Sequence, residues 1–215
     1  MKMTGILQAG VILAVAGHLP TLAGDDHNFY ARIAPTTLFL SEGADIEAGG
    51  ARIPGGTISV GTHTTGTVEF GYYFTPNFSV GFTGGFPPSV GINGAGTLAG
   101  VGKLGSITYG PTALTAQYTF TDFGRIKPYI GAGPMFMIVF DEDDAALKGL
   151  NVKGAVGAVV QAGVDLEVTD RWGLFADIKK GYLRTTATGT LGGTPVAADV
   201  KLDPLAVSMG IKLRF

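Results

Sequence analysis

Apolar and polar residues alternate without interruption at the end of the chain. From position 205 to position 215 every odd-numbered residue is apolar, and every even-numbered residue is small, polar or charged. Successive side chains of a β-strand point to opposite faces, so this pattern predicts a strand with one wholly apolar face. The same alternation recurs in seven earlier segments, at residues 29–34, 67–74, 78–83, 114–120, 129–138, 155–168 and 172–179.

The faces opposite the apolar ones indicate which class of protein carries these strands. They hold glycine, threonine and glutamine together with the carboxylates Asp165, Glu167 and Asp177. A soluble protein does not bury such carboxylates behind a continuous apolar band. A membrane barrel does, because its outside faces lipid and its closed sheet leaves no edge unpaired. We therefore predict an all-β fold, an eight-stranded antiparallel transmembrane β-barrel.

The connections between the predicted strands fall into two length classes. Short segments predict periplasmic turns at residues 75–77, 121–127 and 169–171. Longer segments predict extracellular loops at residues 41–57, 89–104, 141–153 and 187–199. Both termini are then periplasmic. The chain ends inside a strand because that strand closes the barrel, and the terminal Phe215 is similar to the signal that the outer-membrane assembly machinery recognises.

The start of the chain predicts export from the cytoplasm. Met1 and Lys2 form a basic start, residues 6–17 form a short apolar core, and Thr21 and Ala23 offer a cleavage site. We expect residues 1–23 to be a signal peptide and residues 24–215 to be a barrel domain in the outer membrane of a Gram-negative bacterium. A membrane anchor is the alternative, but the apolar core is too short to span a bilayer.

Composition narrows the function further. The 215 residues include 35 glycines and no cysteine, and the formal net charge is −2. This excludes a disulfide scaffold and a cysteine-ligated metal, and it leaves no basic stripe for nucleic acid. We expect no cofactor, no metal and no nucleic-acid partner. The acidic run at residues 141–144 lacks the spacing of a calcium loop, so we interpret it as a solvated loop.

Several inward-facing charges lie near the predicted periplasmic turns and termini. Opposite charges so close together in a low-dielectric lumen should form ion pairs, because an unpaired buried charge is costly. We therefore expect a charged floor that closes the periplasmic end of the barrel. Its members are Arg32, Glu69, Glu167, Lys212 and Arg214.

Towards the outer ends of the strands the inward-facing residues become apolar. An eight-stranded barrel is only wide enough to be filled by side chains or to hold one small ligand. Methionine adapts to apolar ligands of varied shape, so this region is a candidate binding site. A dry plug of interlocked side chains is the alternative. The candidate lining residues are Met135, Met137, Val139, Leu202 and Pro204.

Prolines mark a weak point in the predicted wall. Phe86, Pro87 and Pro88 lie at the outer end of the third strand, and Pro111 lies at the start of the fourth. Proline has no N–H to donate to a neighbouring strand, so consecutive prolines break pairing in a closed barrel. These four residues are candidates for a lateral gate into the lipid. The alternative is that the prolines merely end the strand at a loop.

Several short motifs, in their order and spacing, resemble the OmpW family of eight-stranded outer-membrane barrels. They are Pro111-Thr112, the run from Lys127 to Gly133, Gly163-Val164-Asp165 followed by Trp172, the run from Asp177 to Lys180, Leu202-Asp203-Pro204 and Arg214-Phe215. Leu205 and Leu213 replace the tryptophan and tyrosine that family members often carry. The resemblance implies a narrow hydrophobic channel that passes small apolar molecules, with a sideways opening in its wall.

The sequence therefore predicts a channel-like barrel that binds or passes small hydrophobic molecules and is not an enzyme. Its expected partners are outer-membrane lipid, hydrophobic solutes and the assembly machinery. A filled structural or adhesion barrel is the first alternative. A lipid-modifying enzyme is the second, and it needs a nucleophile beside a base. No motif supports it, and its candidate groups are His63 with Ser59 or Ser106.

Overall fold

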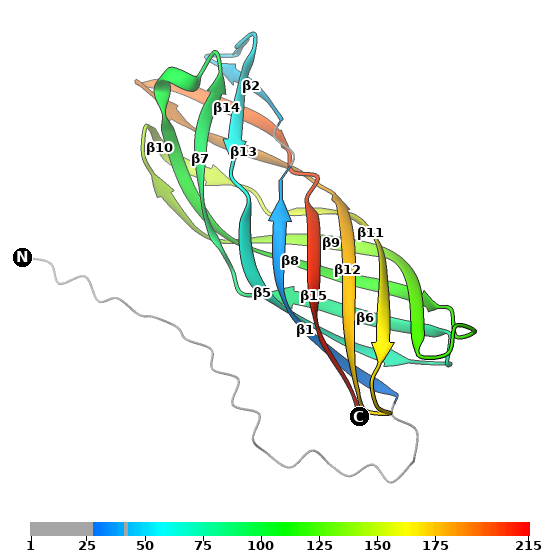
Figure 1. The fold of residues 1–215 in the computed structure, drawn as a ribbon. Coiled ribbons are helices and arrows are strands. Elements are labelled where there is room, and N and C mark those ends of the chain that lie inside the picture. Colours follow the sequence, from blue (N-terminus) through cyan, green and yellow to red (C-terminus); the bar gives the residue numbers. More distant parts are fainter. Residues whose placement is uncertain (1–27, 41–42) are drawn as a thin grey trace, which may run out of the picture.

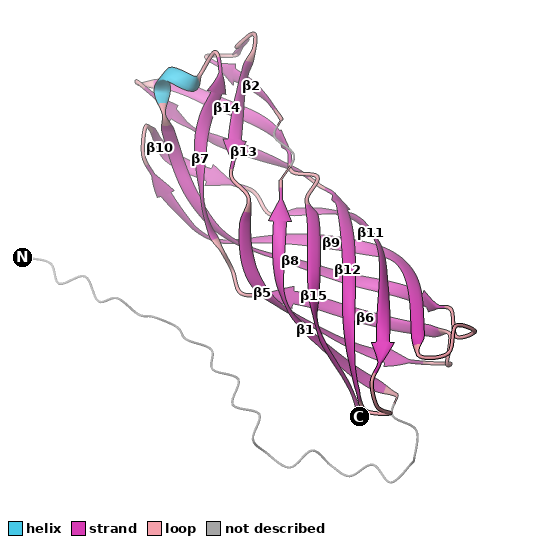
Figure 2. Ribbon diagram, in the orientation of Figure 1, coloured by secondary structure: helices cyan, strands magenta, loops and turns pink. Residues whose placement is uncertain are grey.

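The computed structural model describes residues 28–40 and 43–215, drawn in colour in Figure 1. The expected signal peptide, residues 1–23, lies outside the described residues. Nearly all of the described chain is extended (Figure 2), and its single helical element is a short 3-10 turn, Ala99–Val101. Within residues 28–40 and 43–215, no helix is long and apolar enough to cross a membrane.

Fifteen strands follow one another along the described residues. They are β1 (Phe29–Phe39), β2 (Ala44–Ala48), β3 (Ala51–Arg52), β4 (Gly56–Val60), β5 (His63–Tyr73), β6 (Phe78–Gly85), β7 (Ser89–Gly96), β8 (Lys103–Thr119), β9 (Ile126–Asp144), β10 (Leu147–Val152), β11 (Ala155–Glu167), β12 (Trp172–Tyr182), β13 (Arg184–Leu191), β14 (Thr194–Lys201) and β15 (Leu205–Arg214). One sheet has the order β4-β7-β8-β6-β5-β1-β15-β12-β11-β9, and pairing of β8 with β9 closes it into a barrel.

The barrel also closes between its first and last strands, as the sequence predicts. In the antiparallel ladder of β1 with β15, Tyr30 lies opposite Arg214. The backbone of Phe215 exchanges hydrogen bonds of 2.9 and 3.0 Å with the backbone of Phe29. Several barrel strands are interrupted by one to three residues, so that β4 and β5, β6 and β7, β10 and β11, β12 and β13, and β14 and β15 each follow one another along one strand of the barrel. The predicted eight-stranded antiparallel barrel is confirmed.

The prediction of long extracellular loops is wrong in one respect, because strands fill most of them. β10, β13, β14, β2 and β3 form a second sheet in that order, which faces β4 and the adjoining ends of β8 and β9. Figure 1 shows this upper half extending the barrel half, with the C-terminus at the far end. The cause is a period-two pattern whose apolar face points inwards at Ile46, Ile58, Val60, Ile92, Val152 and Val200.

The polarity of the two faces inverts along individual strands. In the barrel half of β8, Thr115 and Gln117 are buried inside, while Leu114 points outwards and is exposed. In the upper half of β8, the buried inward residues are Ile107 and Tyr109. An apolar outer face is typical of contact with lipid, and an apolar inner face is typical of a protein surrounded by water. One chain thus combines a lipid-facing half with a half patterned like a soluble β-sandwich.

A belt of exposed apolar side chains surrounds the barrel half. All of its strands contribute, and the exposed fractions reach 71% at Val156 and 72% at Met209. Such a continuous exposed apolar surface marks contact with a membrane. Members of the belt include Phe29, Ile33, Phe70, Phe82, Leu114, Ile130, Val160, Ile178 and Ile211.

Candidate functional site

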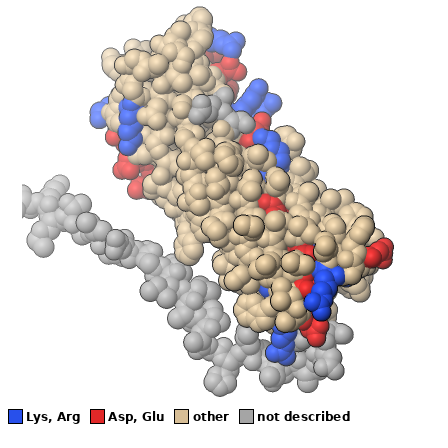
Figure 3. Space-filling model, viewed as in Figure 1, with Lys and Arg blue, Asp and Glu red and all other residues tan. Residues whose placement is uncertain are grey.

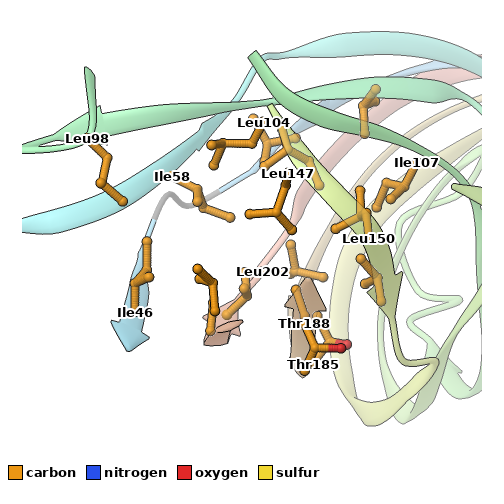
Figure 4. A pocket seen from close by; sticks show the side chains of 18 of the residues that line it. Ile46, Ile58, Leu98, Leu104, Ile107, Leu147, Leu150, Thr185, Thr188 and Leu202 are labelled. Carbon is orange, nitrogen blue, oxygen red and sulfur yellow. The ribbon is translucent and has the colours of Figure 1, made fainter. Parts of the chain in front are cut away.

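An apolar cavity of about 70 Å³ lies between the two sheets of the upper half. Among its lining residues, only Tyr109, Thr185 and Thr188 carry side-chain hydroxyl groups. A cavity with such a lining excludes water and accepts apolar molecules. Figure 4 shows side chains from several strands and from adjoining turns directed into this space, among them Ile46, Ile58, Leu98, Leu104, Leu147, Leu150 and Leu202.

A compact charge network fills the barrel half, with Arg32 of β1 at its centre. Arg32 is 1% exposed. Its guanidinium makes a two-pronged ion pair with Asp165 of β11, at 3.2 and 2.8 Å, and donates to Glu69 of β5 at 2.6 Å. Gln117 of β8 accepts a further hydrogen bond at 3.0 Å, and the ring of Tyr129 lies 4.2 Å from the guanidinium carbon. The planar fork of arginine suits several acceptors and an aromatic face at once.

Two lysines complete the charge network. Lys212 of β15 pairs with Asp165 at 2.5 Å. Lys179 of β12 pairs with Asp177 at 2.6 Å and with Glu69 at 3.2 Å. Together with the central arginine, three cations meet three carboxylates, so the formal charges sum to zero. At this level the side chains of the network fill the narrow lumen of the eight-stranded barrel.

The structure places the predicted floor residues at two levels. Arg32, Glu69 and Lys212 belong to the buried network. Arg214 and Glu167 form a separate ion pair of 3.3 Å, one layer closer to the turns, and each is about one-third exposed. Both also line a polar vestibule that opens below the network.

Sequence reasoning missed half of the network. The expected floor does not include Asp165, Asp177 and Lys179, although the alternation places all three inwards. Two tyrosines were missed as well. Tyr129 donates to Asp177 at 3.0 Å, and Tyr30 donates to Glu69 at 3.1 Å. The signal was available in the period-two pattern of β11 and β12.

The predicted lining residues are divided between two cavities. Met137 and Leu202 line the upper cavity. Met135 and Pro204 line a second cavity of about 50 Å³, which lies between the upper cavity and the charge network. Val139 lines neither cavity and packs against the apolar cluster of the upper half. The two methionines are neighbours on the inner face of β9, so they lie between one cavity and the next.

The barrel wall is interrupted where the sequence places its candidate gate. Pairing of β5 with β6 ends at Thr67 opposite Gly85, and pairing of β4 with β7 starts only at Val60 opposite Ile92. Phe86, Pro87 and Pro88 lie between β6 and β7, outside any strand. Gly66 C=O accepts from Phe86 N–H at 3.0 Å, and Thr65 Oγ1 donates to Phe86 C=O at 2.8 Å.

Pro111 lies at the middle of β8, and its predicted place at the start of a strand is wrong. It pairs with Met137 on the β9 side. On its other side, pairing of β8 with β6 ends at Ala113, and pairing with β7 begins at Thr108. Pro111 borders the same interruption of the wall, where β8 has no paired neighbour on this side. The missing N–H of proline is tolerated there because no strand would accept its hydrogen bond.

A lipid-facing hollow covers this interruption from the outside. Gly85 lines both the hollow and the cavity of about 50 Å³ inside the barrel. The wall between the two is thin at this point, because glycine carries no side chain. Gly85 pairs with Thr67 of β5, but it lies beyond the last pair of β6 with β8, Thr83 opposite Ala113. The hollow is lined by Gly66, Val68, Phe70, Phe82, Gly84, Gly85 and Phe86.

The acidic run belongs to the end of β9, so its interpretation as a loop is wrong. Asp144 accepts hydrogen bonds from the backbone N–H groups of Leu150 and Gly149, both at 2.9 Å. These bonds hold the pKa of Asp144 below its ordinary value, because they stabilise the charged carboxylate. Glu142 accepts from Val152 N–H at 2.8 Å. The carboxylates thus tie β10 to β9.

The candidate base His63 has partners at both ring nitrogens. Its Nε2 lies 3.4 Å from the hydroxyl of Tyr109, and its Nδ1 lies 3.4 Å from the carbonyl oxygen of Gly61. Ser106 Oγ donates to Asp143 at 3.4 Å. These contacts support a structural role for His63, which holds the barrel wall in place beside Tyr109.

The closed barrel, its apolar belt and its paired inner charges define an outer-membrane β-barrel of a Gram-negative bacterium. The OmpW family profile matches residues 26–215, and the chain belongs to the OmpW family. It is 37% identical over 196 residues to "Dibenzothiophene metabolism operon protein PahQ" of Pseudomonas aeruginosa, covering 91% of this chain and 92% of that protein.

Solved structures have the same fold. The crystal structure of OprG from Pseudomonas aeruginosa superposes with a TM-score of 0.81 at 23% identity, covering 87% of this chain and 95% of that one. The solid-state NMR structure of AlkL in DMPC bilayers gives a TM-score of 0.73 at 28% identity, covering 93% and 95%. AlkL is an outer-membrane protein of Ectopseudomonas oleovorans. In this fold the short turns are periplasmic and the upper half is extracellular.

Proposed function

We propose that this protein takes up small hydrophobic molecules from outside the cell and releases them sideways into the outer membrane. The solute enters the apolar upper cavity and passes Met137 and Met135 into the second cavity. It leaves through the interrupted wall at residues 86–88, which Pro111 borders. The protein is then not an enzyme, since it changes the location of the solute and none of its bonds.

The order of three features along the barrel axis carries this proposal. The apolar cavity comes first, the interrupted wall comes next, and the neutral charge network comes last. Entry of an apolar solute into the network is unfavourable in free energy, because the solute would separate ion pairs and offer no charged or polar partner in their place. The thin wall beside Gly85 offers a path from one apolar environment to another.

The two cavities are smaller than a protein cavity known to hold a small aromatic molecule. Their volumes of about 70 and 50 Å³ compare with the roughly 150 Å³ of an engineered protein cavity that binds benzene. Passage therefore requires side chains to move aside. Met135 and Met137 suit this role, because methionine is unbranched and flexible.

The name of one relative agrees with an apolar solute. PahQ is named as a protein of a dibenzothiophene metabolism operon. Dibenzothiophene is an uncharged three-ring aromatic molecule, and we propose solutes of this class for the present protein. A filled structural or adhesion barrel is the alternative, and the uptake experiment below distinguishes it.

Two further roles are proposals from sequence position. We propose that residues 1–23 are a signal peptide, and that the last strand, ending at Phe215, is recognised by the assembly machinery. The stacking of Phe215 on Phe29, with ring centroids 6.2 Å apart, supports a role at the seam where the barrel closes.

The experiment is uptake of N-phenyl-1-naphthylamine by intact Gram-negative cells, since this apolar dye fluoresces only after it enters the membrane. Cells with the protein should take up the dye several-fold faster than cells without it. Met137→Trp should remove at least four-fifths of that difference, because the larger ring fills the passage between the cavities.

The control is Met209→Trp, the same change on the lipid-facing surface, where the side chain is 72% exposed. It should leave uptake unchanged. A polar dye of similar size should enter at the same rate with or without the protein. Equal dye uptake in cells with and without the protein would exclude the conduit and favour the filled structural barrel.

A further inference from the structure

An outward-facing basic patch lies where the upper sheet meets the barrel half. It consists of Lys153, Arg184 and Lys201, all exposed, which line one hollow of about 500 Å³. Arg184 and Lys201 are directly opposite each other in the ladder of β13 with β14. Lys153 N–H donates to the carbonyl of Thr186 at 3.0 Å, two residue pairs further along the sheet. Figure 3 shows basic and acidic side chains gathered where the two halves meet.

Among the described residues, no ion pair balances the positive charge of this patch. Like charges directly opposite each other destabilise a sheet. Two carboxylates share the hollow with the three cations: Asp45 forms an ion pair with Arg52, and Asp199 accepts a hydrogen bond from Thr186 at 3.2 Å. The three cations therefore outnumber the carboxylates of the hollow. Within residues 28–40 and 43–215, no carboxylate oxygen lies within 4.0 Å of a charged nitrogen of the three patch residues. The geometry calls for an external anion.

The patch lies at the upper edge of the apolar belt. Tyr182, 53% exposed, comes two positions before Arg184 on the same strand face, and Val156, 71% exposed, comes three positions after Lys153. At about 3.3 Å per residue, the cations are within roughly 10 Å of lipid-facing side chains. Exposed tyrosine is typical of the boundary between lipid and water. The patch is therefore level with the lipid headgroups of the outer leaflet.

We propose that Lys153, Arg184 and Lys201 bind a phosphate group of the outer-leaflet glycolipid, lipid A, while its acyl chains lie against Val156 and Tyr182. Arginine presents a planar fork to phosphate, and the two lysines add point charges on either side. A lipid phosphate fits better than free phosphate, because the hollow is next to the belt and an attached acyl chain adds apolar contact. The site is on the β13 and β14 side of the molecule, away from the interrupted wall, and does not rest on the proposed uptake.

The test uses the protein purified from outer membranes in detergent, titrated with lipid A and followed by native mass spectrometry. We expect Arg184→Gln with Lys201→Gln to weaken binding of diphosphorylated lipid A about tenfold. Lys201→Arg should retain binding, because it keeps the charge. Lys103→Gln with Lys148→Gln is the matched control, since both are exposed lysines of the upper half outside the hollow. The heat-dependent gel shift of folded barrels checks that every variant is folded.

Two further titrations separate the sources of the anion. Dephosphorylated lipid A should bind the wild type about as weakly as it binds the double variant. Inorganic phosphate at millimolar concentration should not displace lipid A. Equal binding of phosphorylated and dephosphorylated lipid, equal loss in the Lys103 and Lys148 control, or full displacement by inorganic phosphate would each overturn the proposal.

Discussion

Glycines inside the barrel make room for tyrosine rings that cross the lumen. Tyr30 is fully buried and lies directly opposite Gly71. A Cβ atom at Gly71 would lie 2.1 Å from a ring carbon of Tyr30, and one at Gly163 would lie 2.5 Å from the ring of Tyr129. These rings carry the hydroxyls that hydrogen-bond to the network carboxylates. The glycines are therefore part of the charge network although they make none of its bonds.

Gly71→Ala should lower the free energy of unfolding by about 1–3 kcal/mol, because the added methyl group forces the Tyr30 ring away from Glu69. Urea unfolding in detergent, followed by the fluorescence of Trp172, measures the change. Gly84→Ala is the control, since its Cβ would point to the outside and lie 3.8 Å from the nearest atom, in Phe82. The prediction fails if the two variants lose the same stability.

The sequence predicts which face of the barrel each side chain points to, but it does not predict which inward side chains form contacts with each other. Alternation places Arg32, Asp165 and Lys212 inwards with no structural knowledge. That Arg32 meets Asp165 depends on how far neighbouring strands are staggered, since β15 and β12 lie between their strands in the sheet. Stagger is a property of the closed barrel and leaves no local mark in the sequence.

At the scale of elements, the interruption between β6 and β7 results from two consecutive prolines. Pro87 and Pro88 supply no N–H groups, so no regular ladder can form with the strand beside them. Replacing both with threonine restores two donors and adds residues that favour strands. We expect this variant to pair with β5 and to slow dye uptake into intact cells at least threefold.

Pro76→Thr, in the exposed turn between β5 and β6, is the control for this change. It alters one proline at the opposite end of the same strands and should leave uptake as it is. Unchanged uptake in the Pro87 and Pro88 variant, with the barrel folded, would place the exit elsewhere in the wall.

The strands of the upper half escaped prediction for a physical reason. An outward apolar face distinguishes a lipid-facing strand, and the segments 43–57 and 187–199 carry their apolar faces inwards. Glycine-rich turns such as Gly192-Gly193, with φ of 56° and 86°, also made these segments resemble loops. The turns are real, but the residues on either side of them form ladders.

For the whole molecule, uptake of apolar solutes should occur without ion conduction. The charge network contains three cations and three carboxylates in a lumen that side chains fill, so hydrated ions find no continuous path. In planar lipid bilayers the inserted protein should show no steady ohmic current. A stable channel whose current rises with salt concentration would show that the network is open and that the axial route is used.

The inversion of face polarity along β8 also fixes how deeply the molecule sits in its membrane. Below the inversion, an outward Leu114 requires hydrocarbon; above it, outward Ser106 and Thr108 require water. A downward shift by two residues, about 7 Å, would bury hydroxyls and lysines in the hydrocarbon, and an equal upward shift would expose the apolar belt to water. The positions at which the outward residues change from apolar to polar therefore determine how deeply the protein is inserted. Inserting two residues into the apolar belt of every strand would lengthen the belt by about 7 Å, lift the upper half away from the hydrocarbon and raise its basic patch above the headgroups.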